Sequence, residues 1–511
     1  MKKSLIAIAV AGLAYVGAAW TTGRVAEQQI NTELAKLRTM VPSLKITEDK
    51  HMRGVFGSTR LTTVDVAALF DAAQCPATPE PAPQGDATPP PGMGAPAASA
   101  LLVTLKQTIT HGPLPGFGLP AAARVHYEVL VNGQPLAEHL GITTEGEMPV
   151  LTARYGFTGN SRAQWSGDAG KVIYASPDGK GGITVSWPSL RFTANTRSDF
   201  SRMDYVGELP ALTATMLSPK GEPVTLSLQQ LSLKADHQYP LPGQFFVHTG
   251  TDALSIAGIS VEQGGKPLFD AQGLEGKGSG TLDGGLMEST TQIALASVKA
   301  GDETVGPMHY DFTFAKLDAA AYSQFMQTLV SNDLGSCPTP EKTAAFLDSL
   351  KGQVPALLKS GPEFRIDRIS IGYQGEQANI TGKLSLPAAA PAALQDPMAL
   401  LALATANLTV ALPDKLIHTL AVKSVTAQMT HEMAFAQDAE NPAATTPEQH
   451  AEAERLAQAL VAQQIEQALA RNWIVRGKDG VSSSLEYRDG RVVLNGQPLD
   501  LQGLRARASA E

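Results

Sequence analysis

The 511-residue sequence is poor in cysteine, in aromatic residues and in charge. Its two cysteines are too few for a structural zinc site or for a disulfide-rich scaffold. Charged residues make up 17% of the chain, against roughly 25% in an average soluble domain. Because 43% of the residues are hydrophobic, the chain can bury a large core, which argues against wholesale disorder.

Basic residues are also scarce, and they are not clustered. The 40 lysines and arginines and the 49 acidic residues leave a net charge of −9. Nucleic-acid binding needs grouped basic side chains to contact phosphates, so we expect no nucleic-acid partner. Glycine (47) and proline (34) are plentiful instead, which indicates many turns.

An uncharged run occupies residues 4–23 and follows two lysines. Twenty helical residues rise about 30 Å, which matches the hydrocarbon core of a bilayer. We therefore predict an N-terminal transmembrane helix with its N-terminus in the cytoplasm. A cleaved signal peptide is the alternative, because Gly17-Ala18-Ala19 has the small-x-small pattern of a cleavage site. In both cases the body of the protein lies outside the cytoplasm.

The sequence predicts an α+β protein: a large, mainly antiparallel and curved β-sheet, with helices concentrated in the C-terminal half. Runs such as Val125 to Val131 and Val224, Leu226 and Leu228 alternate with polar residues, which is typical of strands with one apolar face. Asn132-Gly133 predicts a hairpin turn, and Gly276–Gly280 predicts a loop. The predicted segments are a transmembrane anchor (1–23), a juxtamembrane helix (24–42), first strands (43–75), a Pro/Ala-rich insertion (76–100), an antiparallel sheet region (101–317) and a mixed helix and strand region ending in a hairpin (318–511).

The clearest C-terminal helix extends from Pro447 to Asn472. Thr446 is suited to cap its N-terminus. Its predicted apolar stripe consists of Leu456, Leu460, Ile465 and Leu469.

The known catalytic motifs are missing from the sequence. There is no G-x-S-x-G and no G-x-x-x-x-G-K, and no two of the ten histidines lie two or four residues apart. His431-Glu432 begins like a zinc-protease helix, but Phe435 occupies the position of the second histidine. We therefore predict no catalytic residue, no cofactor and no metal site, and we expect that the protein is not an enzyme.

Three candidate sites remain. Arg53 is a candidate to hold a lipid phosphate near the anchor, although a glycine bulge at Gly54 explains the same segment structurally. Leu226 and Leu228 are candidates to line an apolar groove, which a packed sandwich would replace. Cys75 and Cys337 are candidates for a disulfide in an oxidising compartment, or they are two separate thiols.

Several short segments together resemble the bacterial YdgA-like family. They are Gly17–Gly23, Arg53–Ser58, His111-Gly112-Pro113, Ser484–Gly490 and Leu494-Asn495-Gly496. The resemblance implies a single-pass inner-membrane protein of a Gram-negative bacterium with its body in the periplasm. The family's function is unknown, so the resemblance implies no catalytic residues. It does not account for the insertion at 76–100 or for the two cysteines.

The leading hypothesis is a non-enzymatic envelope protein that binds a membrane lipid or a protein partner in envelope maintenance. It depends on the anchor, on the one-sided strands and on the missing catalytic motifs. Two alternatives stay open: a periplasmic hydrolase with a dispersed active site, and a structural protein that self-associates as a homo-oligomer.

Overall fold

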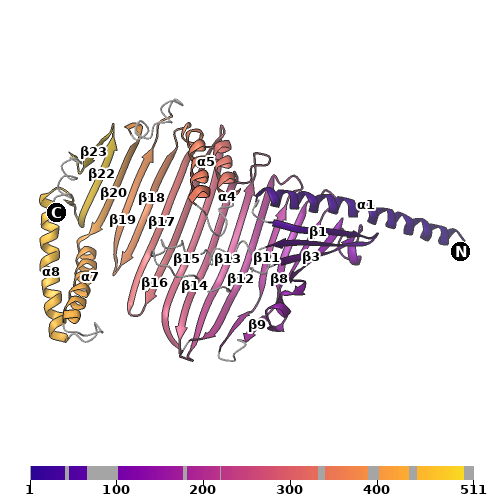
Figure 1. Cartoon of the computed structure of the whole chain (residues 1–511), viewed down its shortest axis with the longest axis horizontal. Helices are drawn as coiled ribbons and strands as arrows, with labels where there is room; N and C mark the ends of the chain where they lie inside the picture. Colours follow the sequence, from indigo (N-terminus) through magenta and orange to yellow (C-terminus); the bar gives the residue numbers. More distant parts are fainter. Residues whose placement is uncertain are drawn as a thin grey trace, which may run out of the picture. The chain divides into compact units, whose positions relative to one another are not determined.

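The computed structural model describes residues 2–40, 45–65, 102–175, 181–218, 220–331, 340–388, 402–436 and 446–499. The chain forms two compact units, and antiparallel strands dominate both (Figure 1). Unit 1 comprises Met1–Leu254, Ile259–Lys266 and Ala319–Val354; unit 2 comprises Ser255–Gly258, Pro267–Asp318 and Pro355–Glu511. The predicted sheet with helices concentrated after residue 318 is confirmed.

Unit 1 contains thirteen complete strands and most of a fourteenth among the described residues. They are β1 (Lys45–Arg53), β2 (Gly57–Asp65), β3 (Leu102–His111), β4 (Ala123–Val131), β5 (Gln134–Pro135), β6 (Ile142–Gly146), β7 (Val150–Tyr155), β8 (Ser161–Gly167), β9 (Gly170–Ala175), β10 (Gly182–Trp187), β11 (Leu190–Thr196), β12 (Arg202–Leu217), β13 (Pro223–Gln238) and most of β14 (Thr249–Gln263). Antiparallel pairs connect β1, β2, β3, β4, β7, β8, β11, β12 and β13 in that order. The second half of β12 also pairs with β10, and β9 and β6 follow outward.

Helix α1 (Lys2–Met40) packs on the sheet of unit 1. Ala26 and Ile30 of α1 form a buried cluster with Ile109, Val125 and Tyr155 of the sheet. Residues 24–40, where the juxtamembrane helix is predicted, form part of one continuous helix, and they supply two of the seven residues of this cluster. The side chains of residues 2–14, where most of the predicted anchor lies, are outside the described part. Among the described residues, no helix combines the length and the hydropathy needed to cross a membrane.

Four shorter helical elements belong to unit 1 or enter it. They are η2 (Pro115–Phe117), α3 (Leu136–His139), α4 (Ala319–Ser331) and α5 (Pro340–Leu358). Helix α5 continues through Pro355 into unit 2.

Among its described residues, unit 2 combines antiparallel strands, several of them long, with the helices α7 (Asp414–Ala436) and α8 (Pro447–Ala470). Its strands are β15 (Lys266–Asp283), β16 (Leu286–Ala300), β17 (Glu303–Asp318), β18 (Glu363–Tyr373), β19 (Glu376–Ser385), β20 (Thr405–Pro413), β21 (Val475–Arg476), β22 (Gly480–Arg488), β23 (Arg491–Leu494) and β24 (Gln497–Pro498). Antiparallel pairing places β15 to β20, then β22 and β23, side by side (Figure 1).

The predicted loop at Gly276–Gly280 is wrong, because these residues lie inside the 18-residue strand β15. Gly276, Gly278 and Gly280 alternate with polar residues, so they occupy one face of the strand and leave it without side chains. Glycine weakens an isolated strand, but the ladder with β16 holds this one in place.

The predicted stripe of α8 is also only partly correct. Thr446 caps the helix in a capping box with Gln449, as the sequence indicates. The buried residues, however, are Ala453, Ala457, Val461 and Ile465, while Leu456 is 47% exposed. Alanines four residues apart allow α7 to approach closely, so the contact face is selected by small size and not by hydrophobicity alone.

The Asn132-Gly133 turn forms as predicted, and a second Asn-Gly turn has the same form. Asn132-Gly133 connects β4 to β5, and Asn495-Gly496 connects β23 to β24. All four residues have positive φ, between 48° and 83°, as a two-residue hairpin turn requires.

Candidate functional site

The first candidate site is an apolar sheet face in unit 1. Residues that pair across an antiparallel ladder share a face, and five strands contribute apolar side chains to this one. We define the apolar face of unit 1 as Ile142, Val172, Tyr174, Ile183, Val185, Leu212, Ala214, Met216, Val224, Leu226 and Leu228. The opposite face of the same ladder carries Thr184, Ser186, Thr213, Thr215, Thr225 and Ser227.

This apolar face is not covered by a second layer in the described part of the chain. Tyr174, Ile183, Met216 and Leu226 are 38–41% exposed, whereas a packed sandwich would bury such residues fully. Leu226 and Leu228, which the sequence singled out as groove residues, lie together on this surface. Large contiguous apolar surfaces on soluble proteins usually mark a binding site.

Unit 2 presents a second surface of the same kind. We define the apolar face of unit 2 as Ile293, Leu295, Met308, Tyr310, Phe312, Phe314, Phe364, Ile366, Ile369, Ile371, Ile380, Leu384, Leu408 and Val410. Five of these side chains are 37–47% exposed: Ile293, Phe314, Ile371, Leu384 and Leu408. The opposite face is charged, with ion pairs such as Arg368–Asp311 at 2.8 Å.

Arg53 ends β1 and contacts α1. Its Nη1 donates to Glu27 Oε2 and its Nη2 donates to the carbonyl oxygen of Trp20, both at 2.9 Å. His51 Nδ1 lies 3.1 Å from Glu27 Oε1, so one carboxylate on the helix binds two residues of the strand. The Arg53 side chain is one quarter exposed. Its role as a lipid-phosphate ligand stays a prediction, and the structure adds a role in fixing α1 to β1.

The segment after Arg53 forms a tight turn. The Gly54 amide donates to the carbonyl oxygen of Gly57 at 2.8 Å, which closes the hairpin between β1 and β2. A Cβ at Gly54 would lie 2.7 Å from that oxygen, so the turn has no room for a side chain there. Gly54 therefore lies in the hairpin turn between β1 and β2, and the expected glycine bulge at this position is wrong.

Ser58 and His111 meet beneath α1, where Ser58 Oγ and His111 Nε2 lie 2.9 Å apart. Such pairs occur in hydrolases, where a third group orients the histidine. Among the described residues, His111 Nδ1 is buried without a partner, and a Cβ at Gly23 would lie 2.5 Å from it. Burial, and then the charges of Arg53 and His51, lower the pKa of His111. The His111 ring thus lies between Gly23 of α1 and Ser58 of β2.

Exposed apolar side chains gather around α1 at the same end of the sheet. We define the apolar rim as Trp20, Val55, Phe56 and Leu114. Tyr15 of α1 stacks on Phe56 with ring centroids 6.2 Å apart, and its hydroxyl donates to the carbonyl oxygen of Leu114 at 3.2 Å. The Arg24 guanidinium lies 4.3 Å from the Trp20 ring. Tryptophan beside arginine is typical of residues at a membrane–water interface.

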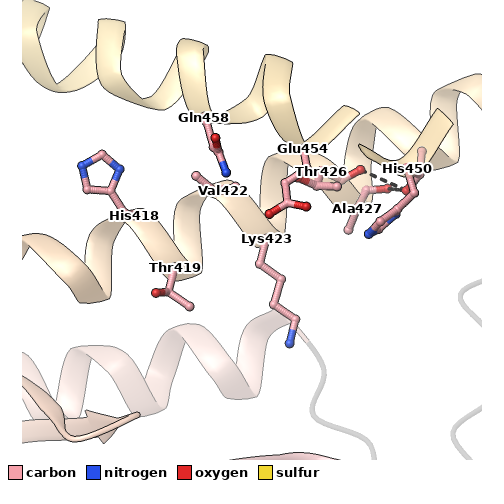
Figure 2. A pocket seen from close by; sticks show the side chains of 10 residues that line it. His418, Thr419, Val422, Lys423, Thr426, Ala427, His450, Glu454 and Gln458 are labelled. Carbon is pink, nitrogen blue, oxygen red and sulfur yellow. Dashed lines mark hydrogen bonds between the residues drawn. The ribbon is translucent and has the colours of Figure 1, made fainter. Parts of the chain in front are cut away.

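A polar cleft lies between α7 and α8 in unit 2. It has a volume of about 770 Å³, and His418, Lys423, Glu454 and Gln458 are among the residues that line it (Figure 2). Lys423 forms an ion pair with Glu303, which also accepts a hydrogen bond from Tyr373 at 2.6 Å. The bond from Lys423, followed by that from Tyr373, lowers the pKa of Glu303. Because Lys423, the cation of the cleft, is already paired with Glu303 outside it, we assign no ligand to the cleft.

The two predicted disulfide partners, Cys75 and Cys337, lie outside the described residues, as does the insertion at 76–100. Sequence patterns found the alternating strands but not Glu27 or Ser58. Neither residue stands out in its own segment. Only the packing of α1 on the sheet brings Glu27 to Arg53 and encloses the contact between Ser58 and His111.

Comparison with known proteins gives two matches. The model of a family described as bacterial proteins of unknown function (DUF945) matches residues 1–502. The chain is also 25% identical to protein YdgA of Escherichia coli (strain K12) over 541 aligned positions, which cover 98% of this chain and 96% of YdgA. These matches confirm the YdgA-like resemblance of the short segments. The chain belongs to the DUF945 family of bacterial proteins.

Proposed function

We propose that the protein is an inner-membrane-anchored periplasmic protein that binds the acyl chains of membrane lipids on its apolar sheet faces. The observation that carries the proposal is the apolar face of unit 1, where four large side chains remain about 40% exposed in register across neighbouring strands. The uncharged run at residues 4–23 provides the anchor.

The position of the apolar rim favours lipid over a soluble ligand. The rim lies beside the part of α1 between Tyr15 and Trp20, in the second half of the uncharged run. Because Tyr15 already contacts the folded body, a helix that leaves the membrane before Tyr15 brings these exposed side chains to the level of the lipid headgroups. Arg24 is exposed there, so its guanidinium is available for a lipid phosphate in addition to Arg53.

The energy available from such binding is substantial. Burying one methylene group contributes about 0.8 kcal/mol, so ten methylenes laid along an apolar face would contribute about 8 kcal/mol. Ordering the chain and losing its translational freedom offset part of this gain. A net affinity that keeps lipid bound through purification is consistent with these magnitudes.

A pair of neighbouring positions in β13 tests the proposal. Leu226 lies on the apolar face, whereas Ser227 is the next residue and points to the opposite face. We would introduce the photoreactive residue p-benzoylphenylalanine at either position and irradiate intact cells. The Leu226 variant is expected to cross-link phospholipid, detected by mass spectrometry, and the Ser227 variant is expected not to do so.

Two results would contradict lipid binding. One is equal phospholipid labelling at both positions. The other is a lipid content in the purified native protein no higher than that of an unrelated single-span protein. Cross-linking of Leu226 to a protein would instead favour a protein partner, or self-association if the product is a dimer of this chain.

A further inference from the structure

Two histidines and one carboxylate converge at the β13–β14 hairpin of unit 1. His237 Nε2 lies 2.6 Å from Asp252 Oδ1, and the rings of His237 and His248 have centroids 4.2 Å apart. One possible ligand atom of each residue lies within 4.8 Å of the other two. His237 is buried, while His248 and Asp252 are partly exposed, so the group is reachable from solvent.

The backbone around these residues holds them in place. A Cβ at Gly250 would lie 1.9 Å from the carbonyl oxygen of Asp236, so β14 can approach β13 this closely only with glycine there. Val247 is completely buried, which anchors the loop immediately before His248. Two turn hydrogen bonds, from the Gln244 and Val247 amides, stabilise the same loop.

Aromatic rings surround the two histidines. Tyr205 meets the His237 ring edge-on at 5.7 Å, and Tyr239 lies 6.3 Å from His237 and 6.1 Å from His248. Phe245 packs against Tyr239 at 6.1 Å. These rings restrict the rotation of the imidazoles, as the surroundings of metal ligands commonly do.

We propose that His237, His248 and Asp252 bind a divalent transition-metal ion, with Zn²⁺ as the representative ligand. Two imidazole nitrogens and one carboxylate oxygen are ligands that Zn²⁺ prefers, at about 2.0–2.2 Å each. Ligand atoms around a tetrahedral ion lie about 3.4 Å from one another at such bond lengths. The present separations, from 2.6 Å between His237 Nε2 and Asp252 Oδ1 up to 4.8 Å, bracket that value.

A bound ion would replace the hydrogen bond between His237 and Asp252. The carboxylate now accepts from one imidazole, and with the ion in place both groups would bind the metal instead. Three protein ligands leave at least one coordination position for water or another small ligand.

Binding of ZnCl₂ to the full-length, detergent-purified protein, measured by isothermal titration calorimetry, tests this site. The protein should carry an affinity tag without histidine. Asp252→Asn removes the charged ligand but preserves the shape of the side chain, and His248→Ala removes a partly exposed ligand. Asp236→Asn is the matched control, because Asp236 is an exposed carboxylate beside His237 that pairs with Arg202.

We expect one Zn²⁺ per chain in the native protein and in Asp236→Asn. We expect at least tenfold weaker binding in Asp252→Asn and His248→Ala, with unchanged circular dichroism. Co²⁺ should produce visible absorption bands in the native protein that are lost in Asp252→Asn. The absence of one-to-one binding, or an equal loss of affinity in Asp236→Asn and Asp252→Asn, would overturn the proposal. Neither result bears on lipid binding, which the photo-cross-linking tests separately.

Discussion

Replacing Asp49 by asparagine should destabilise the contact between the first hairpin and α1. Arg60 Nε and Nη2 donate to the two carboxylate oxygens of Asp49, each at 2.7 Å, and Arg60 Nη1 donates to Asn31 Oδ1 of α1 at 2.8 Å. The Arg60 side chain is only 6% exposed. Asp49→Asn removes the negative charge and places an amide NH₂ opposite a guanidinium donor, which leaves a buried cation without its counter-charge.

The magnitude follows from the exposure of the two partners. Breaking a fully buried ion pair by removing one partner costs about 3–5 kcal/mol. The Asp49 side chain is about one quarter exposed, so water compensates part of the loss. We therefore expect a loss of about 2–3 kcal/mol in the free energy of unfolding, measured by intrinsic fluorescence in detergent.

Asp236→Asn is the control, because Asp236 forms the same two-bond pair with Arg202 on the surface, at 2.9 and 2.6 Å. The side chains of Arg202 and Asp236 are 43% and 41% exposed, so the loss of this ion pair should cost at most about 1 kcal/mol. The pH dependence provides a second check. Hydrogen bonds from Arg60 lower the pKa of Asp49, so its stabilising effect is present at neutral pH and disappears as the pH falls below about 4. Equal effects of the two substitutions, or a change below about 0.5 kcal/mol for Asp49→Asn, would refute the reasoning.

Three further predictions concern α1, α8 and the membrane anchor. Burial raises the pKa of Glu33, so ionising this carboxyl group lowers the stability of the protein as the pH rises above the ordinary pKa of 4.5. The Tm of Glu33→Gln should therefore increase relative to that of the native protein between pH 4.5 and pH 8. A difference in Tm that stays constant over this range would contradict the prediction. In α8, the buried Val461→Ala should lower the free energy of unfolding, measured by chemical denaturation, by about 1–2 kcal/mol. The exposed Leu456→Ala should lower it by less than about 0.5 kcal/mol. The reverse order would support the predicted leucine stripe. A reporter enzyme fused after Glu511 should be active only outside the cytoplasm, and the protein should resist alkaline extraction from membranes; a soluble form lacking the first 20 or so residues would indicate a cleaved signal peptide instead.

Much of the sheet could be predicted because its determinants are local. The alternation in Val125 to Val131 and the following Asn132-Gly133 contain a strand, a face and a turn within nine residues, and the structure has all three. The same reasoning located Leu226 and Leu228 on one face of β13. Side-chain alternation has a period of two in every strand, so a short window of sequence is enough to detect it.

The failed predictions have one cause in common: the structure of each segment depends on the neighbouring strand or helix that packs against it. Gly276–Gly280 has the composition of a loop, yet its neighbour β16 holds it as a strand. Leu456 looks like a core residue of α8, but α7 packs on the alanine face. His237 and His248 are eleven positions apart and match no ligand spacing, and a β-hairpin brings them together. The only sequence signal for this group was two histidines and Asp252 near the ends of two neighbouring predicted strands. Many such combinations occur by chance.

The segments that carry the family resemblance near the N-terminus converge on one place in the structure. Gly23 of α1 touches the His111 ring, and Gly112 lies against Tyr15 of α1, where a Cβ would be 3.3 Å from the tyrosine hydroxyl. Arg53 binds the carbonyl oxygen of Trp20, and Ser58 completes the contact with His111. Each glycine permits a close approach, and each polar group satisfies a partner on the opposite side of the joint. What these segments specify is therefore the attachment of α1 to the sheet. If the apolar face of unit 1 binds lipid, a rigid attachment of this kind would hold that face at a fixed distance from the membrane. Gly23→Ala tests this: it should displace His111 and loosen α1, and it should reduce phospholipid cross-linking from Leu226 although Leu226 itself is unchanged.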